Sequence, residues 1–515
     1  MAGSAGTGQA PAGVTFGSAT GRWVLLASIL GSGLAGIDMT VVNIALPAIG
    51  RDFDTGFSSL QWTVNAYTLT LASFILLGGS LGDRYGRRRV FLVGVVWFAV
   101  TSLACGLSPN AEVLIASRAL QGVGAALMTP ASLAMIQSSF VPGDRARAVG
   151  AWSGLGGVAT AIGPFLGGWL VETASWRWVF LINVPLAALV VVLALRHVPE
   201  TRDTSAGGPV DVLGAALGAL GLAGVTYALV EAPSRGVGAV PVLVAGVLGV
   251  AACVAFVLVE RRAASPMLPL RIFASRQFRA VNGLTFGLYA AFSVVLFLLT
   301  LQLQVVAGFS PLAAGTATLP ITVVMLLLSA RAGALAQRIG PRPQLVLGPV
   351  VCAAGTLLML RIGPDASYVL DVLPGILVLG LGFAMLVAPL TSTALASADA
   401  RHAGVASGVN NAVARAAGLL AVALVPAVAG LTGDVDDDPT AFLGGFRTAV
   451  LISGGILLVS AALAALTVSN DRLSGDDPDD PDDPATPAPP VQEPLRHCGI
   501  GAPPLVVTRD AAPSG

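Results

Sequence analysis

The sequence predicts an all-α membrane protein with fourteen spanning helices, and three observations lead to this fold class. Of the 515 residues, 55% are hydrophobic and 11% are charged, with a mean hydropathy of +0.82, whereas soluble domains usually carry about 25% charged residues. The hydrophobic residues form fourteen segments, each long enough for a spanning helix of about 20 residues. Arginine is concentrated in alternate connections between the segments, as is typical of membrane proteins with a fixed orientation.

The fourteen predicted spans follow one another along almost the whole chain. They cover approximately residues 23–47, 59–81, 90–107, 111–131, 147–171, 177–195, 211–231, 240–260, 278–306, 313–335, 344–361, 372–396, 404–430 and 446–468. Pro47 is expected to end the first span, because proline disfavours continuation of a helix.

The two ends of the chain are predicted to lie outside the folded region. Residues 1–21 are small and polar without an early basic cluster, so we expect a disordered tail before a retained first helix rather than a cleaved signal. Residues 470–515 contain the run DDPDDPDDPATPAPP, and such an acidic, proline-rich segment cannot bury a core. We expect a disordered cytoplasmic tail there.

Arginine indicates which ends of the spans face the cytoplasm. With a cytoplasmic N-terminus, 18 arginines fall on the cytoplasmic side and five on the other side. An even number of spans then returns the C-terminus to the cytoplasm. We therefore expect a multi-pass protein of the plasma membrane with both termini in the cytoplasm.

Composition also argues against several classes of function. The net charge is zero, which gives no electrostatic basis for binding nucleic acid. The three histidines lie outside the apolar segments, and the four cysteines form no CxxC pair, so no metal site or disulfide framework is indicated. The sequence contains no nucleotide-binding loop and no nucleophile triad, and we expect neither an enzyme nor a bound cofactor.

An internal repeat divides the spans into two sets of six. The segment GGSLGDRYGRR at residues 78–88 has a second copy, RAGALAQRIGPR, at residues 331–342, with matching positions 254 residues apart. The same offset relates residues 147–154 to residues 401–408. Parallel halves around a midplane site are a transporter design. The predicted parts are an N-terminal six-helix bundle over 22–196, a linker with two extra helices over 197–277, and a C-terminal six-helix bundle over 278–469.

Four motifs in chain order resemble signatures of the major facilitator superfamily. They are IDMTVVNIALP (37–47), GGSLGDRYGRRRVF (78–91), LIASRALQGVGAA (114–126) and AIGPFLGGWL (161–170). With the two extra helices, residues 22–468 resemble the fourteen-helix drug:proton antiporter branch of that superfamily, with two six-helix bundles plus two inserted helices.

The resemblance implies proton-coupled efflux of small amphipathic or cationic compounds by alternating access, which amounts to multidrug or antibiotic export. A same-fold exporter dedicated to one metabolite or one self-made antibiotic is the alternative. The implied partners are a small-molecule substrate, protons and the lipid bilayer, and we expect the chain to function as a monomer.

The loop after the second span carries the first functional candidates. Its glycines permit a tight turn, and its arginines fix the loop to the inner face. The resemblance implies that Asp83 is a gate residue whose charge contacts hold the inner side shut in the outward-facing state, although the second copy has Gln337 at this position. For the arginines, a simple topology anchor is the alternative. The gate motif comprises Gly79, Asp83, Arg84, Gly86, Arg87 and Arg88.

Arg118 is placed deep within the fourth predicted span. Because a charge inside the bilayer costs about 3 kcal/mol on insertion scales, Arg118 should face the bundle interior and have a partner. Gln121 lies three residues further on nearly the same helix face. The resemblance associates this arginine with proton coupling, and a buried structural hydrogen-bond centre is the alternative.

The fifth predicted span contains the segment GPFLGG. Pro164 removes one backbone hydrogen bond and bends the helix. Gly163, Gly167 and Gly168 allow a neighbouring helix to approach closely. The resemblance associates this antiporter helix motif with exporters rather than importers, and ordinary packing of small residues is the alternative.

Asp38 lies in the outer part of the first predicted span. It follows Arg22 by sixteen residues, which is a rise of about 24 Å in a hydrocarbon layer of about 30 Å, and Thr40 and Asn43 are nearby. A carboxylate there can take up and release a proton as water access changes, or attract a cationic substrate, and either property suits proton-coupled export. A helix-capping or interhelical hydrogen-bonding acid is the alternative.

Other polar residues on the spans could line a central cavity. The predicted cavity residues are Asn65, Tyr67, Gln302, Asn411 and Arg415. Gln61 and Gln304 could also line the cavity, or they could lie only at the membrane interface. Glu231, at the outer end of the seventh span, is expected to be an ordinary loop charge.

Overall fold

The computed structural model describes residues 13–202, 211–263, 266–397, 403–431 and 438–470. Within these ranges it contains fourteen helical segments that are long and apolar enough to cross a membrane, so the predicted number of spans is confirmed. The predicted C-terminal tail from residue 471 onward, residues 1–12 of the predicted N-terminal tail, and Arg401 of the repeat lie outside the described residues.

The helices fall into three groups along the chain. The N-terminal half contains α1 (Ala19–Phe53), α2 (Phe57–Tyr85), α3 (Arg87–Gly106), α4 (Ala111–Ser139), α5 (Pro142–Thr173), α6 (Trp178–Leu181) and α7 (Asn183–His197). The inserted helices are α8 (Val212–Arg235) and α9 (Val240–Arg262). The C-terminal half contains η1 (Leu270–Ala274), α10 (Arg276–Leu301), η2 (Gln302–Val306), α11 (Pro311–Ala317), α12 (Leu319–Ile339), α13 (Arg342–Leu358), η3 (Met359–Arg361), η4 (Tyr368–Val372), α14 (Leu373–Ala396), α15 (Ala403–Val428) and α16 (Pro439–Thr467).

The first helix is longer than its predicted span. Ser18 caps it by accepting a hydrogen bond from the backbone N–H of Gly21 (3.1 Å). The helix then continues through Pro47 as far as Phe53, and Asp54 ends it with a φ angle of 49°. The prediction that Pro47 ends the helix is therefore wrong, because packed membrane helices tolerate an internal proline when neighbouring groups compensate for the lost hydrogen bond.

The described part of the N-terminal tail is ordered, which corrects the prediction of disorder for residues 13–21. The backbone N–H of Val14 donates to Ser139 O (2.8 Å) at the end of α4. The guanidinium of Arg147, on α5, lies 4.2 Å from the centre of the Phe16 ring. The chain leading into α1 is thus attached to the connection between α4 and α5.

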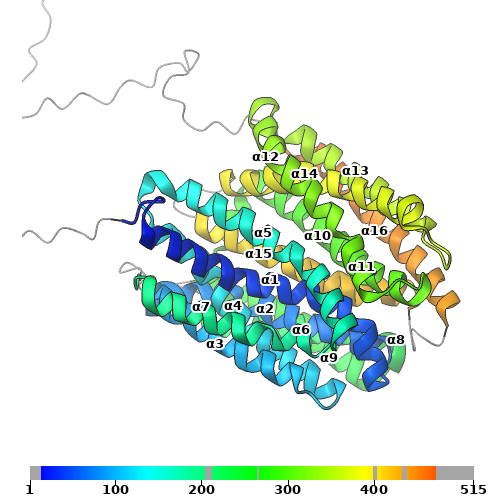
Figure 1. Ribbon diagram of the computed structural model, residues 1–515. Coiled ribbons are helices and arrows are strands. Elements are labelled where there is room, and N and C mark those ends of the chain that lie inside the picture. The colour runs from blue at the N-terminus through cyan, green and yellow to red at the C-terminus, as the bar shows by residue number, and fades with distance from the viewer. Residues whose placement is uncertain (1–12, 203–210, 264–265, 398–402, 432–437, 471–515) are drawn as a thin grey trace, which may run out of the picture. The chain divides into compact units, whose positions relative to one another are not determined.

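Each half repeats the same helix pairing. In the N-terminal half, α4 packs against α2 and α3, and α1 packs against α5. In the C-terminal half, α14 packs against α12 and α13, and α10 packs against α15 (Figure 1). The pairs correspond one to one when α10 is matched with α1, as the 254-residue offset requires.

The two copies of the loop motif are held in the same way. The backbone N–H of Arg88 donates to Glu200 Oε1 (3.0 Å). The backbone N–H of Arg342, which lies 254 positions further on, donates to Asn470 Oδ1 (3.2 Å). In each half, a side chain from just beyond the last helix therefore fixes the motif loop. We call this end of the bundle the arginine-rich end, and the end at which α1 meets α2 the opposite end.

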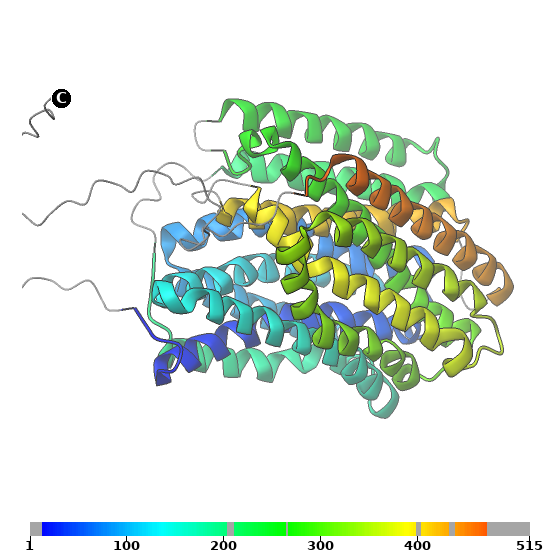
Figure 2. The same ribbon diagram turned by 90° about the horizontal axis from the view of Figure 1, so that it is seen from above.

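The inserted helices form a hairpin at the edge of the bundle (Figure 2). An added Cβ on Gly221 of α8 would lie 2.5 Å from Cys253 Sγ, and one on Gly224 would lie 2.5 Å from Ala245 O, so α8 and α9 approach closely. On its other side, α8 packs against α2 of the N-terminal half and α15 of the C-terminal half. The hairpin therefore contacts both halves.

Glu231 fastens this hairpin to the N-terminal half, which corrects its prediction as an ordinary loop charge. Glu231 is 9% exposed and lies within α8. Its Oε1 accepts hydrogen bonds from Trp62 Nε1 (2.9 Å) and Ser58 Oγ (3.2 Å) on α2. Its Oε2 pairs with Arg235 (2.6 Å). The partners on α2 precede Glu231 by more than 160 residues, so local sequence could not reveal them.

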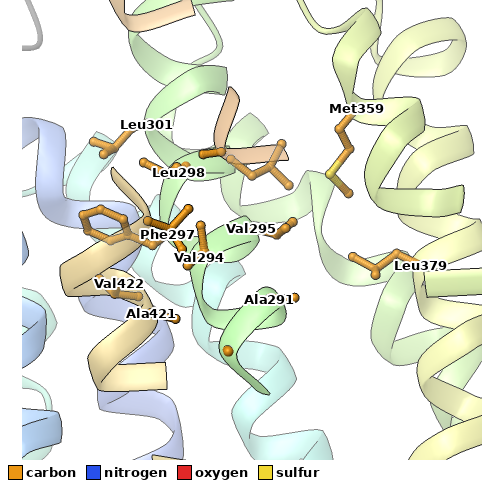
Figure 3. Packing of buried hydrophobic residues seen from close by; sticks show 14 of the residues in the cluster. Ala291, Val294, Val295, Phe297, Leu298, Leu301, Met359, Leu379, Ala421 and Val422 are labelled. Carbon is orange, nitrogen blue, oxygen red and sulfur yellow. The ribbon is translucent and has the colours of Figure 1, made fainter. Parts of the chain in front are cut away.

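One large hydrophobic cluster joins the two halves. It contains buried residues of α1 and α2 together with residues of α10, α13, α14, α15 and α16. Figure 3 shows part of this cluster, with Val294 and Phe297 from α10 and Val422 from α15. The halves are thus in apolar contact.

Candidate functional site: a buried charge cluster

The structure brings Asp38, Arg118 and Gln121 together inside the N-terminal half. Asp38 lies on α1, and the other two lie on α4, which packs beside α1. Asp38 is fully buried and Arg118 is 1% exposed. Their side chains form an ion pair through Asp38 Oδ2 and Arg118 Nη1. The sequence predicted a partner for Arg118 inside the bundle, but it did not indicate that this partner is Asp38.

Gln121 contacts both charged groups. Its Oε1 accepts a hydrogen bond from Arg118 Nη1 (2.6 Å), and its Nε2 donates one to Asp38 Oδ1 (2.9 Å). The spacing of three residues on α4 places the amide beside the guanidinium. Each charge therefore has its counter-ion and a neutral dipolar partner, as buried charges require.

Aromatic rings enclose the guanidinium. Arg118 Cζ lies 4.3 Å from the centre of the Tyr67 ring and 5.7 Å from that of Phe180. Arg118 Nε also donates to the backbone O of Thr63 (3.2 Å). A cation over an aromatic face gains about 2 kcal/mol when both are desolvated. Tyr67, a predicted cavity residue, is fully buried and forms a wall of the charge cluster.

Asn183 and Ser102 complete the cluster, and sequence analysis missed both. Asn183 Nδ2 donates to Asp38 Oδ1 (3.0 Å) and lies 3.1 Å from Ser102 Oγ. Ser102 Oγ also accepts from Gln121 Nε2 (2.6 Å). The available signal was a single asparagine at the start of α7 among apolar residues, because a polar side chain in a spanning helix needs a partner. A lone serine gives no comparable signal.

Thr40 and Asn43 have other surroundings. The hydroxyl of Thr40 lies 3.1 Å from the backbone O of Thr160 on α5, to which it can donate. Pro164 accounts for this contact, because it lacks an N–H and leaves the carbonyl four residues earlier without its helical donor. Asn43 Oδ1 is buried without a hydrogen-bond partner in the described structure. Among the three predicted residues of α1, which are Asp38, Thr40 and Asn43, only Asp38 is hydrogen-bonded to Arg118 in the described structure.

The GPFLGG segment packs α5 against helices of both halves. An added Cβ on Gly163 would collide with Thr40 Oγ1, and one on Gly167 would meet the α1 backbone. An added Cβ on Gly168 would lie 2.5 Å from Pro311 O, at the start of α11 in the C-terminal half. The segment therefore connects the helix that carries Asp38 with the opposite half of the molecule.

Asp83 and Arg88 of the gate motif contact residues of the N-terminal half. Asp83 and Arg87 form an ion pair at 2.7 Å. Arg84 lies 5.7 Å from the centre of the neighbouring Tyr85 ring. Gly86 joins α2 to α3 with a φ angle of 109°, which residues with a side chain rarely adopt, and its counterpart Gly340 has 84°. The gating role of Asp83 stays a prediction.

The other predicted cavity residues lie in different settings. Asn65 is 1% exposed on α2, and both polar atoms of its amide lack hydrogen-bond partners among the described residues. Gln302 is fully buried and donates to a backbone carbonyl of its own half. Arg415 Nη1 lies 3.2 Å from Met39 Sδ of the other half. Asn411 is exposed and donates to its own helix.

Comparison with known proteins identifies the family. A sequence model of the Major Facilitator Superfamily matches residues 28–422. The chain is 37% identical over 473 residues to the puromycin resistance protein pur8 of Streptomyces alboniger, covering 88% of this chain and 93% of that protein. It is 36% identical over 440 residues to the tetracenomycin C resistance and export protein of Streptomyces glaucescens, covering 84% and 81%. It is 34% identical over 452 residues to the methylenomycin A resistance protein of Bacillus subtilis strain 168, covering 87% and 95%.

Solved structures agree with the fold. The chain resembles the crystal structure of a D-xylose-proton symporter with a TM-score of 0.62 at 17% identity, covering 88% of this chain and 99% of that one. It resembles a POT family transporter with a TM-score of 0.63 at 15% identity, covering 86% and 97%. The fourteen spans and the resistance-protein relatives confirm the predicted fourteen-helix branch. The chain therefore belongs to the Major Facilitator Superfamily, and it is a membrane transporter rather than an enzyme.

Proposed function

We propose that this transporter exports antibiotic-like small molecules in exchange for protons. The resistance proteins that match most of its length support export as the direction of transport. The antiporter helix motif on α5, which packs against α1 and against α11 of the C-terminal half, supports the same direction. The observation that carries the proton-coupling part is the ion pair of Asp38 and Arg118, both buried in a helical bundle that must change shape to transport.

The pair supplies a physical link between proton binding and conformation. When Asp38 takes up a proton, its carboxyl group becomes neutral and no longer compensates the charge of Arg118. A buried charge without its partner is unfavourable by about 3–5 kcal/mol. The N-terminal half therefore favours a different arrangement, in which the guanidinium reaches water or another anion. Proton release restores the ion pair and the original arrangement.

The Asn183 side chain can form a hydrogen bond with Asp38 before and after the carboxylate is protonated. Its Nδ2 now donates to the Asp38 carboxylate, and its Oδ1 is buried without a hydrogen-bond partner among the described residues. A neutral carboxylic acid has an O–H that needs an acceptor. Rotation of the amide by half a turn presents Oδ1 to that hydrogen. One side chain thus serves both protonation states.

The arginine distribution supports a membrane orientation with both termini in the cytoplasm. The arginine-rich end of the bundle then faces the cytoplasm, and the opposite end faces outward. We further propose that one chain suffices for transport, because the charge cluster and both helical halves belong to the same chain.

The experiment uses purified protein in proteoliposomes with an imposed pH gradient and a panel of chemically unrelated dyes and antibiotics. Export predicts substrate movement that accelerates with the gradient, together with proton movement in the opposite direction that depends on substrate. Substrate movement that is indifferent to the gradient would contradict proton coupling. Transport of none of the panel, by protein that is folded, would contradict the proposed substrate class.

A dedicated exporter is the second candidate, and the names of the relatives favour it in one respect. Four of them are named for a single antibiotic: puromycin, tetracenomycin C, methylenomycin A or lincomycin. Others are named as multidrug resistance proteins, such as Stp of Mycobacterium tuberculosis, which is 36% identical over 389 residues. The same panel separates the candidates, since a dedicated exporter moves one compound class and a multidrug exporter moves several.

A further inference from the structure

Two glutamines connect the halves near the opposite end of the bundle. Gln61 Nε2, on α2, donates to the backbone O of Val422 on α15 (2.7 Å). Gln304 Nε2, in η2, donates to the backbone O of Ile44 on α1 (3.0 Å). Each half thus supplies one amide donor and one backbone acceptor to the other half. The two bonds form a reciprocal pair across the boundary between the halves.

The Gln61 bond supplies a donor to a backbone carbonyl that a proline leaves without one. Pro426 lies four residues after Val422 within α15, and it has no backbone N–H. The Val422 carbonyl therefore lacks its usual helical donor. Gln61 is 4% exposed, so its amide reaches this carbonyl in a buried setting where an unpaired acceptor is unfavourable.

The second bond begins in a local distortion of helix geometry. The segment η2 has π-helical hydrogen bonding, and single π turns are frequent at functional sites. Gln302 Nε2 donates to the backbone O of Ile362 within the C-terminal half (3.1 Å), whereas Gln304 faces the other half. Two glutamines of one short segment thus have different roles, and the first is a matched control for the second.

Aromatic side chains seal the same end. The ring of Phe57, at the start of α2, lies 5.8 Å from that of Phe297 on α10 and 6.5 Å from that of Phe442 on α16. All three are at most 4% exposed. One ring of the N-terminal half therefore packs against two rings of the C-terminal half, close in sequence to the Gln61 bond.

We propose that Gln61 and Gln304 are gate residues that hold the opposite end closed, and that both bonds break when that end opens during transport. This rests on the proposed function in one respect, which is that the two halves alternate between open ends. Water can replace each bond once the end opens, so the net contribution of a bond is small and the closure is reversible. The pair favours the closed state without locking it.

The test places spin labels on the two halves at the opposite end, in a background without the native cysteines. Leu107, after α3, and Val369, in η4, are suitable positions because they are 66% and 62% exposed. Distances between the labels report the fraction of molecules open at that end. Gln61→Leu and Gln304→Leu should each raise this fraction about fivefold, as expected for losing one net hydrogen bond, whereas Gln302→Leu should leave it unchanged.

The variant Pro426→Ala tests independently whether Gln61 acts on the carbonyl that Pro426 leaves without a donor. It returns a backbone N–H to α15, so the Val422 carbonyl gains a donor within its own helix and depends less on Gln61. In that background, Gln61→Leu should change the open fraction less than twofold. An equally large effect of Gln61→Leu with alanine at 426 would contradict the role given to the open carbonyl.

Distance distributions of Gln61→Leu and Gln304→Leu that match those of the wild type would overturn the gate. The measurement requires neither substrate nor a pH gradient. A protein that shows the expected shifts but exports nothing would contradict the proposed function and leave the gate intact. A protein that exports normally without the shifts would contradict the gate alone.

Discussion

At the scale of single residues, the central feature is a pair of opposite charges removed from water. The ion pair of Asp38 and Arg118 is useful to a transporter because it is conditional, since a single proton removes one of its two charges. The surrounding amides and the Tyr67 ring stabilise the charged arrangement. In this orientation they do not hold a neutral carboxyl equally well, because the amides of Gln121 and Asn183 both present N–H donors to it, and Asn183 must rotate to offer an acceptor.

Removal of one charge should be worse than removal of both. Arg118→Gln leaves the Asp38 carboxylate buried without its counter-ion, and we expect the protein to lose about 3 kcal/mol of stability together with transport. The double variant Asp38→Asn/Arg118→Gln should recover most of that stability but no proton-coupled transport. Thermal unfolding in detergent and efflux from proteoliposomes measure the two properties separately.

Equal stability of the single and double variants would show that the two side chains are energetically independent. Arg118→Lys is a further control, because it keeps the charge but lacks the planar group that bonds Asp38, Gln121 and Thr63 together. We expect it to be more stable than Arg118→Gln and still impaired in transport.

Asn183 should affect the coupling of efflux to pH, beyond any loss of stability. Asn183→Leu removes one donor to the Asp38 carboxylate and the acceptor that we propose for its protonated form. Hydrogen bonds to charged groups contribute about 1.5–3 kcal/mol, so gradient-driven efflux should fall by roughly tenfold or more. Asn43→Leu changes the same residue type on a spanning helix outside the cluster, and it should leave the dependence of efflux on pH near that of the wild type. Identical pH profiles for both variants would remove Asn183 from the mechanism.

How much of this site could be predicted depended on the kind of signal that each residue gives. Arg118 and Asp38 were identifiable because a charged side chain in a membrane-spanning segment is energetically unfavourable and therefore usually marks a functional site. Their pairing was not identifiable, because 80 residues separate them and the relative rotation of α1 and α4 is set by packing. Ser102 was out of reach for a different reason, since serine is common in membrane helices and carries no charge.

At the scale of elements, prolines explain two contacts that the sequence alone leaves unassigned. Pro164 frees the Thr160 carbonyl, which Thr40 faces, and Pro426 frees the Val422 carbonyl, to which Gln61 donates. Gln61 compensates for the N–H that Pro426 lacks, whereas the Thr40 hydroxyl can donate either to Thr160 O (3.1 Å) or to Ile37 O of its own helix (2.9 Å). Sequence analysis predicted the bend at Pro164 but could not predict which helix would supply the donor.

The inserted hairpin should depend on Glu231. Glu231→Ala removes the acceptor of Trp62 Nε1 and Ser58 Oγ and leaves these donors facing an apolar residue. We expect the free energy of unfolding to fall by about 1–2 kcal/mol. The midpoint of thermal unfolding should then fall by up to a few degrees. Glu112→Ala, at an exposed position in the first turn of α4, is the control. An unchanged midpoint for Glu231→Ala would mean that the hairpin is held by apolar packing alone.

The spans themselves were predictable because hydropathy and length are sufficient to identify spanning helices. Their ends were less predictable, as α1 shows by continuing past Pro47. The π-helical segment η2 was not predictable either, because a local change in hydrogen bonding leaves no distinct pattern of apolar residues.

At the scale of the whole chain, the repeat predicted from a 254-residue offset corresponds to equivalent helix pairs in the two halves. The halves differ in their polar residues, however. Asp38 corresponds to Phe292 under that offset, and Arg118 corresponds to Ile376, because Gly380-x-Gly382 of α14 matches Gly122-x-Gly124 of α4. The charge cluster therefore belongs to one half only. We infer that the N-terminal half senses the proton and that the C-terminal half follows through the contacts of α5 and of the two glutamines.

The contacts between halves were beyond the reach of sequence analysis. Gln61 and Gln304 were recognised only as polar residues that could be interfacial, because their acceptors are backbone carbonyls, which every residue has. Such contacts depend on the rotation and separation of whole bundles. They become visible only when the helices are placed in three dimensions.

Proton coupling through Asp38 is tested most directly by substrate-driven proton movement in proteoliposomes that contain either the wild type or Asp38→Asn. We expect substrate-dependent proton movement for the wild type and none for Asp38→Asn, in protein that remains folded. Asp52→Asn, which alters an exposed carboxylate paired with Arg177, should behave like the wild type. Normal proton exchange by Asp38→Asn would contradict the claim that this carboxylate carries the coupled proton.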